Sequence, residues 1–447
     1  MNVLRPVCLL AALSIFAGHT FADDWPQWNG KTGKGIVTES GLLETIPADG
    51  LPVAWKSPVS WGYSGPAIAN GRVFVTDYQL KSGKIANNPG ARDELTGTER
   101  VLCLDEKTGN ELWKHTYARD YAVSYGGGPR VVPTVHDGRV YTIGAEGDLV
   151  CLNAESGDVV WQHDFAKEYG AVTPFWGHSA APLVYKGSLI CLVGGEGSLV
   201  VAFDLVTGKE KWKTLSSEGK DGTGYCPPTI INHAGVDQLL VWSPKTLSSL
   251  NPETREVYWQ HKLEPGYGMS ILPPMLDGNL LYTAGENSKS LMLELSTDKP
   301  AAKEVWRGTP RNSVYFATSS GLFENGHIYG ADIRSGAMVC VQASDGKRLW
   351  QTTQLTMGKE NVRRAGHASA FMLKTTGDNY VLFTETGDVV SATMNPAGYK
   401  ETGRFNAIEP TENISRRKLV WTYPAIANGR LYLRNDKEVI AYDLTAK

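Results

Sequence analysis

The sequence lacks the features that direct a chain into a membrane or onto nucleic acid. Beyond residue 22, no apolar run approaches the ~20 residues that a membrane-spanning helix needs. Lysine and arginine total 44 against 47 aspartates and glutamates, a net charge of −3, and no long block of one charge occurs. These absences argue against a transmembrane segment in the mature chain and against general nucleic-acid binding.

Common catalytic motifs are missing as well. The phrase GGEGSL from Gly194 has no following Lys-Ser or Lys-Thr, and GGGP from Gly126 precedes a strand pattern instead of a helix. No G-x-S-x-G nucleophile elbow is present. The sequence therefore favours neither a phosphate-binding loop nor a serine hydrolase.

Cysteine is scarce, and no two cysteines are adjacent. Five follow residue 22, and Cys103, Cys151 and Cys340 stand at the same position of a repeated phrase. Equivalent positions of different repeats lie far apart in space, so these three are poorly placed to form disulfides. The odd number leaves at least one thiol free. We expect buried thiols that pack as small apolar side chains.

The first 22 residues are typical of a secretory signal peptide. Arg5 precedes an apolar run over residues 7–17, and Thr20 and Ala22 stand three and one positions before a cleavage point. We expect cleavage after Ala22 and a periplasmic or secreted protein.

What the sequence does contain is one phrase that recurs and ends each time in tryptophan. The copies are LDEKTGNELW, LNAESGDVVW, FDLVTGKEKW, LNPETREVYW and VQASDGKRLW, which end at Trp113, Trp161, Trp212, Trp259 and Trp350. A glycine stands four positions before each tryptophan except where Arg255 replaces it. A repeat of roughly 45 residues is the signature of a propeller or solenoid. We expect the repeated tryptophans to pack between neighbouring units, and the repeated His115, His163 and His261 to be structural as well.

Eight strand-opening phrases predict an all-β, eight-bladed β-propeller of four-stranded antiparallel blades. Each phrase, such as PTVHDGRVYTIG, alternates apolar residues around an Asn-Gly, Asp-Gly or Lys-Gly turn. We expect one domain over residues 23–447. The eighth copy ends before its outer strand, so residues 51–57, which contain Trp55, are expected to complete the last blade.

Two copies of the repeat, the fifth and the seventh, depart from the pattern, and the first copy carries an insertion. Residues before Trp306 form a longer phrase, and the seventh copy has no tryptophan, so Phe405 is a candidate for its place. Residues 79–100, polar and glycine-containing, are expected to form a solvated loop that serves as a lid or a partner contact.

The phrase D/N-x-x-[TS]-G-x-x-x-W resembles the repeat of the pyrroloquinoline-quinone (PQQ) propellers. DWPQWNG, GYSGPAIANGRVFV and NPAGYK are similar to exported PQQ-like propellers related to outer-membrane protein assembly factor B. The resemblance implies the fold and a noncatalytic binding or scaffold role in envelope or outer-membrane protein assembly. The alternative is a PQQ-dependent oxidoreductase or a polysaccharide-acting enzyme. The PQQ alcohol dehydrogenases use a vicinal disulfide and a calcium ion. This sequence has no adjacent cysteines, so we expect that the protein binds no cofactor, and binding of PQQ with calcium is the lesser alternative.

Candidate binding residues are those that do not repeat and that precede the innermost strands, because these loops line a propeller's channel mouth. They are Tyr63, Arg130, Trp176, His178, Tyr225, Tyr267, Tyr315, Arg364, His367, Trp421 and Tyr423. They either fill the channel or bind a protein segment or another extended polar or anionic ligand. We expect no catalytic residue and a monomeric protein.

His178 and His367 are the candidates for metal chemistry. Both lie in Gly-His-small phrases, on the third and seventh copies, which face each other across an eight-bladed ring. Two histidines are half of a zinc site. Without a third ligand or a carboxylate, hydrogen bonding to an inner strand is the favoured role, and we expect no metal.

Overall fold

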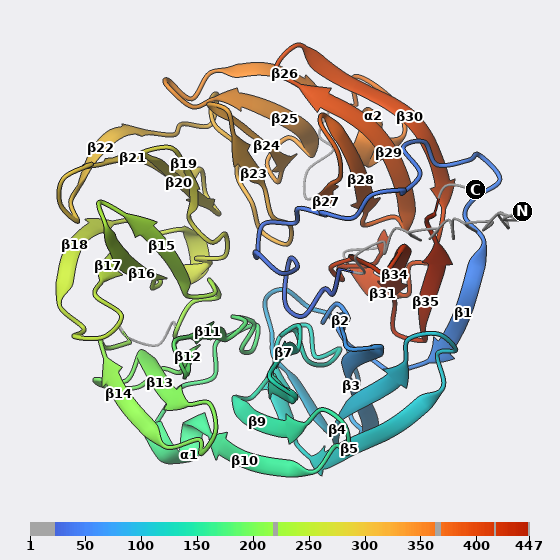
Figure 1. The fold of residues 1–447 in the computed structure, drawn as a ribbon, viewed down its shortest axis with the longest axis vertical. Helices are drawn as coiled ribbons and strands as arrows, with labels where there is room; N and C mark the ends of the chain where they lie inside the picture. The colour runs from blue at the N-terminus through green and yellow to red at the C-terminus, as the bar shows by residue number, and fades with distance from the viewer. Residues whose placement is uncertain (1–22, 218–221, 363–367, 415–416, 446–447) are drawn as a thin grey trace, which may run out of the picture.

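The chain forms a ring of eight antiparallel blades around a central axis (Figure 1). The structure, a computed structural model, describes residues 23–217, 222–362, 368–414 and 417–445. The predicted all-β eight-bladed propeller is confirmed. No helix in these described ranges is long and apolar enough to cross a membrane.

The strands occupy four concentric positions. The innermost strands are β2 (Ala67–Ala69), β7 (Thr134–His136), β11 (Leu183–Tyr185), β15 (Thr229–His233), β19 (Met275–Asp277), β23 (Leu322–Glu324), β27 (Ala370–Lys374) and β33 (Ala425–Ala427). The second strands are β3 (Arg72–Ser82), β8 (Arg139–Ile143), β12 (Ser188–Leu192), β16 (Val236–Trp242), β20 (Leu280–Gly285), β24 (His327–Asp332), β28 (Asn379–Thr384) and β34 (Arg430–Arg434).

The third strands are β4 (Asp93–Asp105), β9 (Asp148–Asn153), β13 (Val200–Asp204), β17 (Thr246–Leu250), β21 (Lys289–Leu295), β25 (Ala337–Gln342), β29 (Asp388–Asn395) and β35 (Glu438–Asp443). The outer strands are β5 (Glu111–Ala118), β10 (Val159–Asp164), β14 (Glu210–Thr214), β18 (Val257–Lys262), β22 (Ala302–Arg307), β26 (Arg348–Thr352), β30 (Gly398–Asn406) and β1 (Val53–Pro58). Short additional elements are β6 (Tyr121–Val123), β31 (Glu412–Ile414), β32 (Arg417–Leu419), α1 (Phe165–Tyr169), α2 (Gln354–Met357) and the 3₁₀ turn η2 (Gly266–Gly268).

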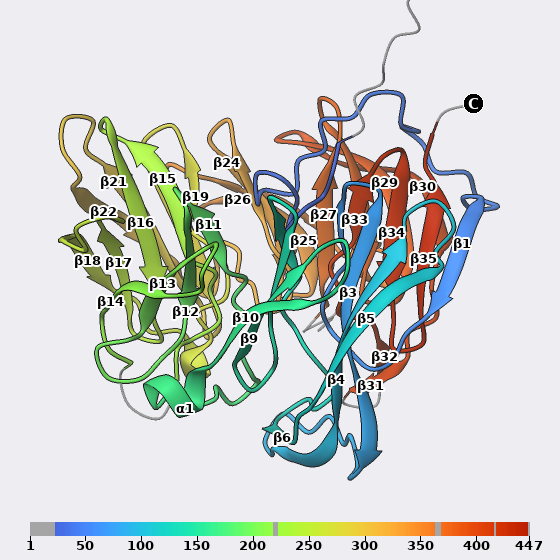
Figure 2. The ribbon, with the colours of Figure 1, turned by 60° about the horizontal axis from the view of Figure 1, so that its bottom comes forward.

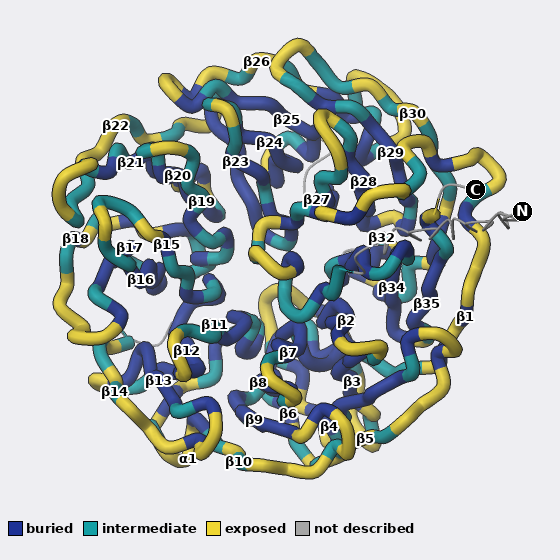
Figure 3. The backbone as a smooth tube through the Cα atoms, viewed as in Figure 1, coloured by how far each residue is buried: buried dark blue, intermediate teal, exposed yellow. Residues whose placement is uncertain are grey.

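Burial follows this radial order. The second and third strands are almost wholly buried, whereas outer strands such as β5 alternate between exposed and partly buried residues (Figure 3). A strand that is buried on both faces has a continuous run of apolar residues, whereas a strand that is buried on one face alternates apolar and polar residues. The apolar clusters lie between neighbouring blades, so each blade depends on the next.

The predicted closure by the N-terminal strand is confirmed. β1 pairs with β35 antiparallel, with Val53 opposite Tyr442 and Trp55 opposite Ala441. The last blade therefore contains strands from both ends of the propeller.

The repeated tryptophans are structural, as predicted. Each stands one residue after a bulge in its outer strand. The Trp113 indole N–H donates to the Ala154 carbonyl in the next blade at 3.1 Å, and Trp350 reaches the Asn395 carbonyl at 2.8 Å. A side chain at Gly157, where φ is +77°, would meet the Trp113 ring at 2.6 Å. The glycine and the tryptophan of the phrase are thus the two sides of one contact between neighbouring blades.

The seventh blade lacks this contact and is completed differently. The bulge in β30 places Gly403, and not Phe405, in the register of the tryptophan. A side chain at Gly403 would meet the Ile46 carbonyl oxygen at 2.0 Å, and the Ile46 N–H donates to Ser391 at 3.0 Å. The N-terminal segment fills the space that the indole fills elsewhere, and Phe405 packs edge-on against Tyr442 of the last blade.

The N-terminal segment also crosses one end of the central channel (Figure 1). The Val135 N–H donates to the Pro26 carbonyl, Asn29 donates to Ser320, and the Val37 N–H donates to the Lys374 carbonyl. These contacts tie the segment to the second, sixth and seventh blades. Figure 2 shows it on the face opposite β6 and α1.

The insertion over residues 79–100 is not a loop, contrary to the sequence-based expectation. β3 and β4 continue as a hairpin that pairs as far as Ser82 and Thr96, and β6 adds a strand against β4. Tyr78 stacks on Tyr121 with ring centroids 4.1 Å apart, beside Leu95. This small core makes the hairpin an ordered arm that extends below the ring (Figure 2), and only residues 83–92 at its end lie outside strands.

The five cysteines of the described chain are buried and unbridged, as predicted. Burial raises the pKa of the Cys103 thiol to about 12 and that of Cys340 to about 11. They act as small apolar residues between strands.

Candidate functional site

A cavity of about 1110 Å³ lies at the centre of the ring, at the mouth that faces the hairpin arm. Its walls come chiefly from the loops that lead into the innermost strands. Seven of the sequence-predicted residues line it: Tyr63, Arg130, Trp176, Tyr225, Tyr267, Trp421 and Tyr423. Because these loops are contributed by blades all around the ring, residues far apart in sequence meet in one cavity.

Of the other four predicted residues, the two that the structure describes lie elsewhere. His178 is buried against Phe165, and Tyr315 is buried in the core between the fifth and sixth blades, where its hydroxyl donates to the Thr309 carbonyl at 2.7 Å. Arg364 and His367 fall outside the described residues. Tyr315 thus holds its loop and does not face the cavity.

His178 has no metal-binding partners in the part of the chain that the structure describes. Its ring Nε2 has no hydrogen-bond partner among the described residues. Burial, with Arg119 nearby, lowers the pKa of His178 to about 4. The described residues contain no group of three histidine, cysteine or acidic side chains that could hold a metal.

Aromatic rings dominate the walls. Trp176 contacts Tyr225 and Tyr267 with centroids 5.8 and 6.5 Å apart, and Tyr125 meets Trp421 edge-on at 5.8 Å. Tyr125 and Tyr267 have φ values of +52° and +58°, a left-handed conformation that costs energy for a residue with a Cβ atom. The fold holds both rings at the cavity despite that cost, and Tyr267 is 76% exposed.

Two arginines stand on one side of the cavity. Arg130 donates to the carbonyls of Ser124 and Tyr125, with its guanidinium carbon 5.1 Å from the centre of the Tyr63 ring. Arg92, from the hairpin arm, donates to the Ala122 and Thr173 carbonyls. Both guanidiniums therefore brace the loop over residues 122–125 through neutral acceptors.

Trp176 and Glu286 each leave one polar atom in the cavity wall unused. The Trp176 indole N–H and the Glu286 Oε2 are buried, and neither has a hydrogen-bond partner among the described residues. Buried polar atoms without partners are costly, and in a cavity wall they mark positions where a ligand can complete the bonding.

Behind this wall lies a buried carboxyl group, Glu412, at the start of β31. Tyr63, Arg130 and Asp436 are close enough to act on it electrostatically. Burial, reinforced by the Asp436 carboxylate, raises the pKa of Glu412 well above its ordinary value. Burial of this kind disfavours the charged form of a carboxyl group.

The N-terminal segment forms the inner end of the cavity. Trp28 lines it and meets Tyr423 edge-on with centroids 5.5 Å apart. Tyr423 also packs on Phe371 at 4.7 Å. Trp28 was missed by the sequence-based selection because it does not precede an inner strand, and the phrase DWPQWNG gives no local signal of its position.

Other wall residues were missed as well, two of them because they come from other elements. Arg92 lies in the insertion, Phe175 precedes the selected Trp176, and Glu286 follows a second strand instead of preceding an inner one. The rule that selected inner-strand loops finds the rim of the channel, and it cannot find groups that arrive from other elements.

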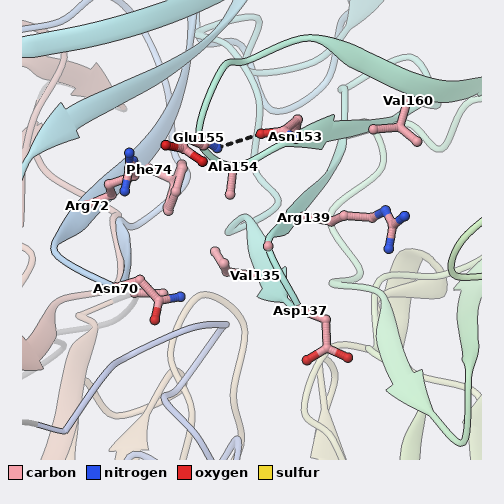
Figure 4. Close-up of a pocket in the computed structure, with 12 residues that line it drawn as sticks. Asn70, Arg72, Phe74, Val135, Asp137, Arg139, Asn153, Ala154, Glu155 and Val160 are labelled. Atoms are coloured by element: carbon pink, nitrogen blue, oxygen red, sulfur yellow. Dashed lines mark hydrogen bonds between the residues drawn. The ribbon is translucent and has the colours of Figure 1, made fainter.

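A second cavity, of about 420 Å³, lies between the first and second blades (Figure 4). Its charged residues include Arg72, Asp137, Arg139 and Glu155, and Asn153 accepts the Glu155 N–H at 2.8 Å. Arg72 and Arg139 follow equivalent turns of the repeat, as Arg430 does in the last blade. This recurrence indicates a structural groove between blades.

The described lining residues of the central cavity do not supply the ligands that calcium requires. Calcium takes six to eight oxygen ligands, mainly from carboxylates and carbonyls. Glu286 is the one carboxylate among the described lining residues. The residues present therefore do not fit a calcium-dependent quinone site.

Comparisons with known proteins agree on the fold. No curated protein matches the sequence. Among solved structures, a europium-containing methanol dehydrogenase is 14% identical with a TM-score of 0.60, covering 94% of this chain and 89% of its own. A quinohemoprotein alcohol dehydrogenase from Comamonas testosteroni is 14% identical with a TM-score of 0.59, covering 95% of this chain and 81% of its own. At this identity the likeness shows the fold alone.

The structure of BamB from Moraxella catarrhalis is also similar, at 16% identity and a TM-score of 0.40, covering 90% of this chain and 99% of its own. A family model described as outer membrane protein assembly factor BamB matches residues 97–239 and 243–447. These matched ranges span most of the ring and include the repeated tryptophan phrases. The chain therefore belongs to the family of outer membrane protein assembly factor BamB.

Proposed function

We propose that the protein is an exported, noncatalytic binding platform that acts in envelope or outer-membrane protein assembly. Its family membership supports the assembly role. The N-terminal pattern of a signal peptide supports export to the periplasm or beyond. The central cavity is the surface on which a partner segment binds.

The observation that carries this proposal is the aromatic composition of the cavity. Exposed rings such as Tyr267 offer large contact areas at a small cost in side-chain entropy, which is why aromatic and arginine residues are enriched where proteins bind other proteins. Exposed Val172, at 52%, extends the apolar surface at the mouth. A cavity with one described carboxylate favours binding over acid–base chemistry, which needs paired groups.

The experiment places a photo-crosslinking phenylalanine analogue at Tyr267 in the producing cell. The matched control carries the same analogue at Leu349, which is 36% exposed on outer strand β26 and outside the cavity. We expect discrete cross-linked envelope proteins from position 267 and none from position 349. The same preparations are tested for the absorbance of a quinone and for oxidation of alcohols.

Two results would contradict the proposal. A stoichiometric quinone with alcohol oxidation, and no product from position 267, would make the protein a quinoprotein oxidoreductase. Turnover of a polysaccharide that Tyr267→Ala abolishes would make it a glycan-acting enzyme.

A further inference from the structure

The central cavity is closed at its inner end, which limits what can enter it. Trp28 and Tyr423 form that end, and the N-terminal segment lies across it, held by hydrogen bonds from Val135 to the Pro26 carbonyl and from Asn29 to Ser320. A chain end or a single side chain that enters from the mouth can stop at this segment, whereas a continuous extended segment would have to pass it.

Part of the cavity wall is apolar. Trp28, Met269, Ile271, Ile333 and Trp421 contribute to it, together with Tyr423. Burial of a large apolar or aromatic side chain here is favourable because it removes apolar surface from water. This wall therefore suits one bulky side chain of the incoming ligand.

The loop side of the cavity is cationic. Within the described structure, neither Arg92 nor Arg130 forms an ion pair with a carboxylate, and both use neutral carbonyls as acceptors. Glu412, behind this wall, is buried, and burial raises its pKa well above its ordinary value. Two guanidiniums that donate to carbonyls and not to carboxylates favour an anionic ligand group, and a guanidinium binds a carboxylate with particular geometric fit.

The unused polar atoms add a second requirement. The Trp176 indole N–H needs an acceptor, and the Glu286 Oε2 needs a donor. A carboxylate supplies acceptors, whereas a peptide N–H supplies a donor. A polypeptide C-terminus carries both groups next to one side chain.

We propose that this cavity binds the C-terminal end of a partner polypeptide, with the terminal carboxylate on Arg92 and Arg130 and a large apolar terminal side chain against Trp28, Trp421 and Tyr423. The inference rests on the proposed binding function and names the part of the partner that is bound. The last peptide N–H of the partner donates to Glu286. A free aromatic carboxylic acid shares the anionic and apolar groups but lacks this N–H.

Titration calorimetry on the full-length protein tests the proposal with three probes. These are the peptide Gly-Ser-Gly-Ser-Phe with a free carboxylate, the same peptide as its C-terminal amide, and 3-phenylpropionate. We expect the free acid to bind at least about tenfold more tightly than the amide and than 3-phenylpropionate.

Variants separate the charge from the fold. Arg92→Met and Arg130→Met should each weaken binding of the free-acid peptide about tenfold and leave binding of the amide unchanged. Arg130→Lys should retain part of the preference, and Arg255→Met, on an exposed outer turn, should change nothing. Circular dichroism on each variant checks that the propeller is intact.

Equal binding of the acid and the amide would overturn the proposal, as would equal binding of 3-phenylpropionate. Absence of binding by all three probes would also overturn it. None of these outcomes affects cross-linking from position 267, which tests the proposed function separately.

Discussion

The indole N–H of Trp55 donates to the Glu106 carbonyl at 2.8 Å and so joins the last blade of the ring to the first. Trp55 is 6% exposed, and its six-membered ring lies over Gly109. The contact repeats the one between every pair of neighbouring blades that carries the full phrase. Here it joins strands from the two ends of the sequence.

Substitution at the glycine tests this contact. Gly109 and Gly187 both have φ of +73°, but a side chain at Gly109 would lie 2.5 Å from the Trp55 ring, whereas nothing lies within 4 Å at Gly187. Both alanine variants carry the same backbone strain. We expect Gly109→Ala to lower the free energy of unfolding by about 2 kcal/mol more than Gly187→Ala, because overpacking adds to the strain. Denaturant titration measures the difference, and equal losses would show that the contact does not matter.

Removal of the closing strand should be more damaging than loss of one indole. Trp55→Ala should cost about 3 kcal/mol or more, because it removes a buried ring and its hydrogen bond. Trp212→Ala is the matched control, since Trp212 is partly exposed and its neighbour carries Arg255 in place of the glycine. Deletion of residues 23–60 should lower the melting temperature much further, because it exposes the edge of β35. A deletion variant that melts like the full-length chain would contradict the role of β1.

The buried thiols make a chemical prediction. The cysteines of the described chain are unbridged, and burial raises the pKa of Cys151 to about 12 and also raises that of Cys191 and Cys226. Thiolates are the reactive form, so native protein should react with almost no alkylating reagent. In denaturant, all five thiols should react, and a reductant should leave the melting temperature unchanged. A thiol count below five in denaturant without reductant would reveal a disulfide.

His178 should make stability depend on pH. Its pKa is about 4 in the folded protein and about 6.5 when unfolded, so the unfolded state binds more protons between these values. The stability that it contributes is present above pH 6.5 and is lost as pH falls towards 4, by up to about 3 kcal/mol.

Asp148 acts in the opposite direction. Burial raises its pKa to about 7, so its contribution is present at low pH and is lost as pH rises through 7. His178→Asn isolates the histidine: this variant should lose less stability than the wild type between pH 6.5 and 4.5. Parallel curves for the two proteins would show that the ring does not titrate in this range.

Tyr267→Ala should separate binding from stability. The ring is 76% exposed, so its removal should shift the melting temperature by no more than about 2 °C. Cross-linking from a second mouth position, Val172, should fall severalfold in the same variant if Tyr267 contacts the partner. Val206→Ala is the control, since Val206 is 57% exposed and lies outside the cavity. Unchanged cross-linking would exclude Tyr267 from the binding surface.

The ring could be predicted from the sequence because its contacts repeat. The tryptophan and glycine of each phrase meet between neighbouring blades, so one local pattern encodes the interface many times. The repeat also predicts where the strand of Trp55 pairs, since the incomplete last blade needs an outer strand. The blade number follows from the eight strand-opening phrases, and the tryptophan phrase gives the phase of the outer strands.

The remainder could not be predicted because it depends on contacts that occur once. Ile46 takes the place of a tryptophan through Ser391, and Trp28 reaches the cavity because Asn29 is held by Ser320. Nothing near these residues in sequence signals their partners. Arg92 lies at the cavity because a hairpin carries it there. The sequence predicted a polar loop instead of this hairpin, since the strand pattern of residues 79–100 is weak. Tyr315 and His178 satisfied the rule for channel loops, but their side chains turn into the core.

The pairing of Val53 with Tyr442 sets an order of events during synthesis. Each of the first seven blades draws its strands from one continuous stretch, so it can form as that stretch emerges. The outer strand of the eighth blade is made before all of them, and its partner is made after all of them. Closing so long a loop is slow, because the chain loses conformational entropy before the new contacts form. The nascent ring thus stays open, with β1 unpaired and able to pair wrongly, until the final strand arrives.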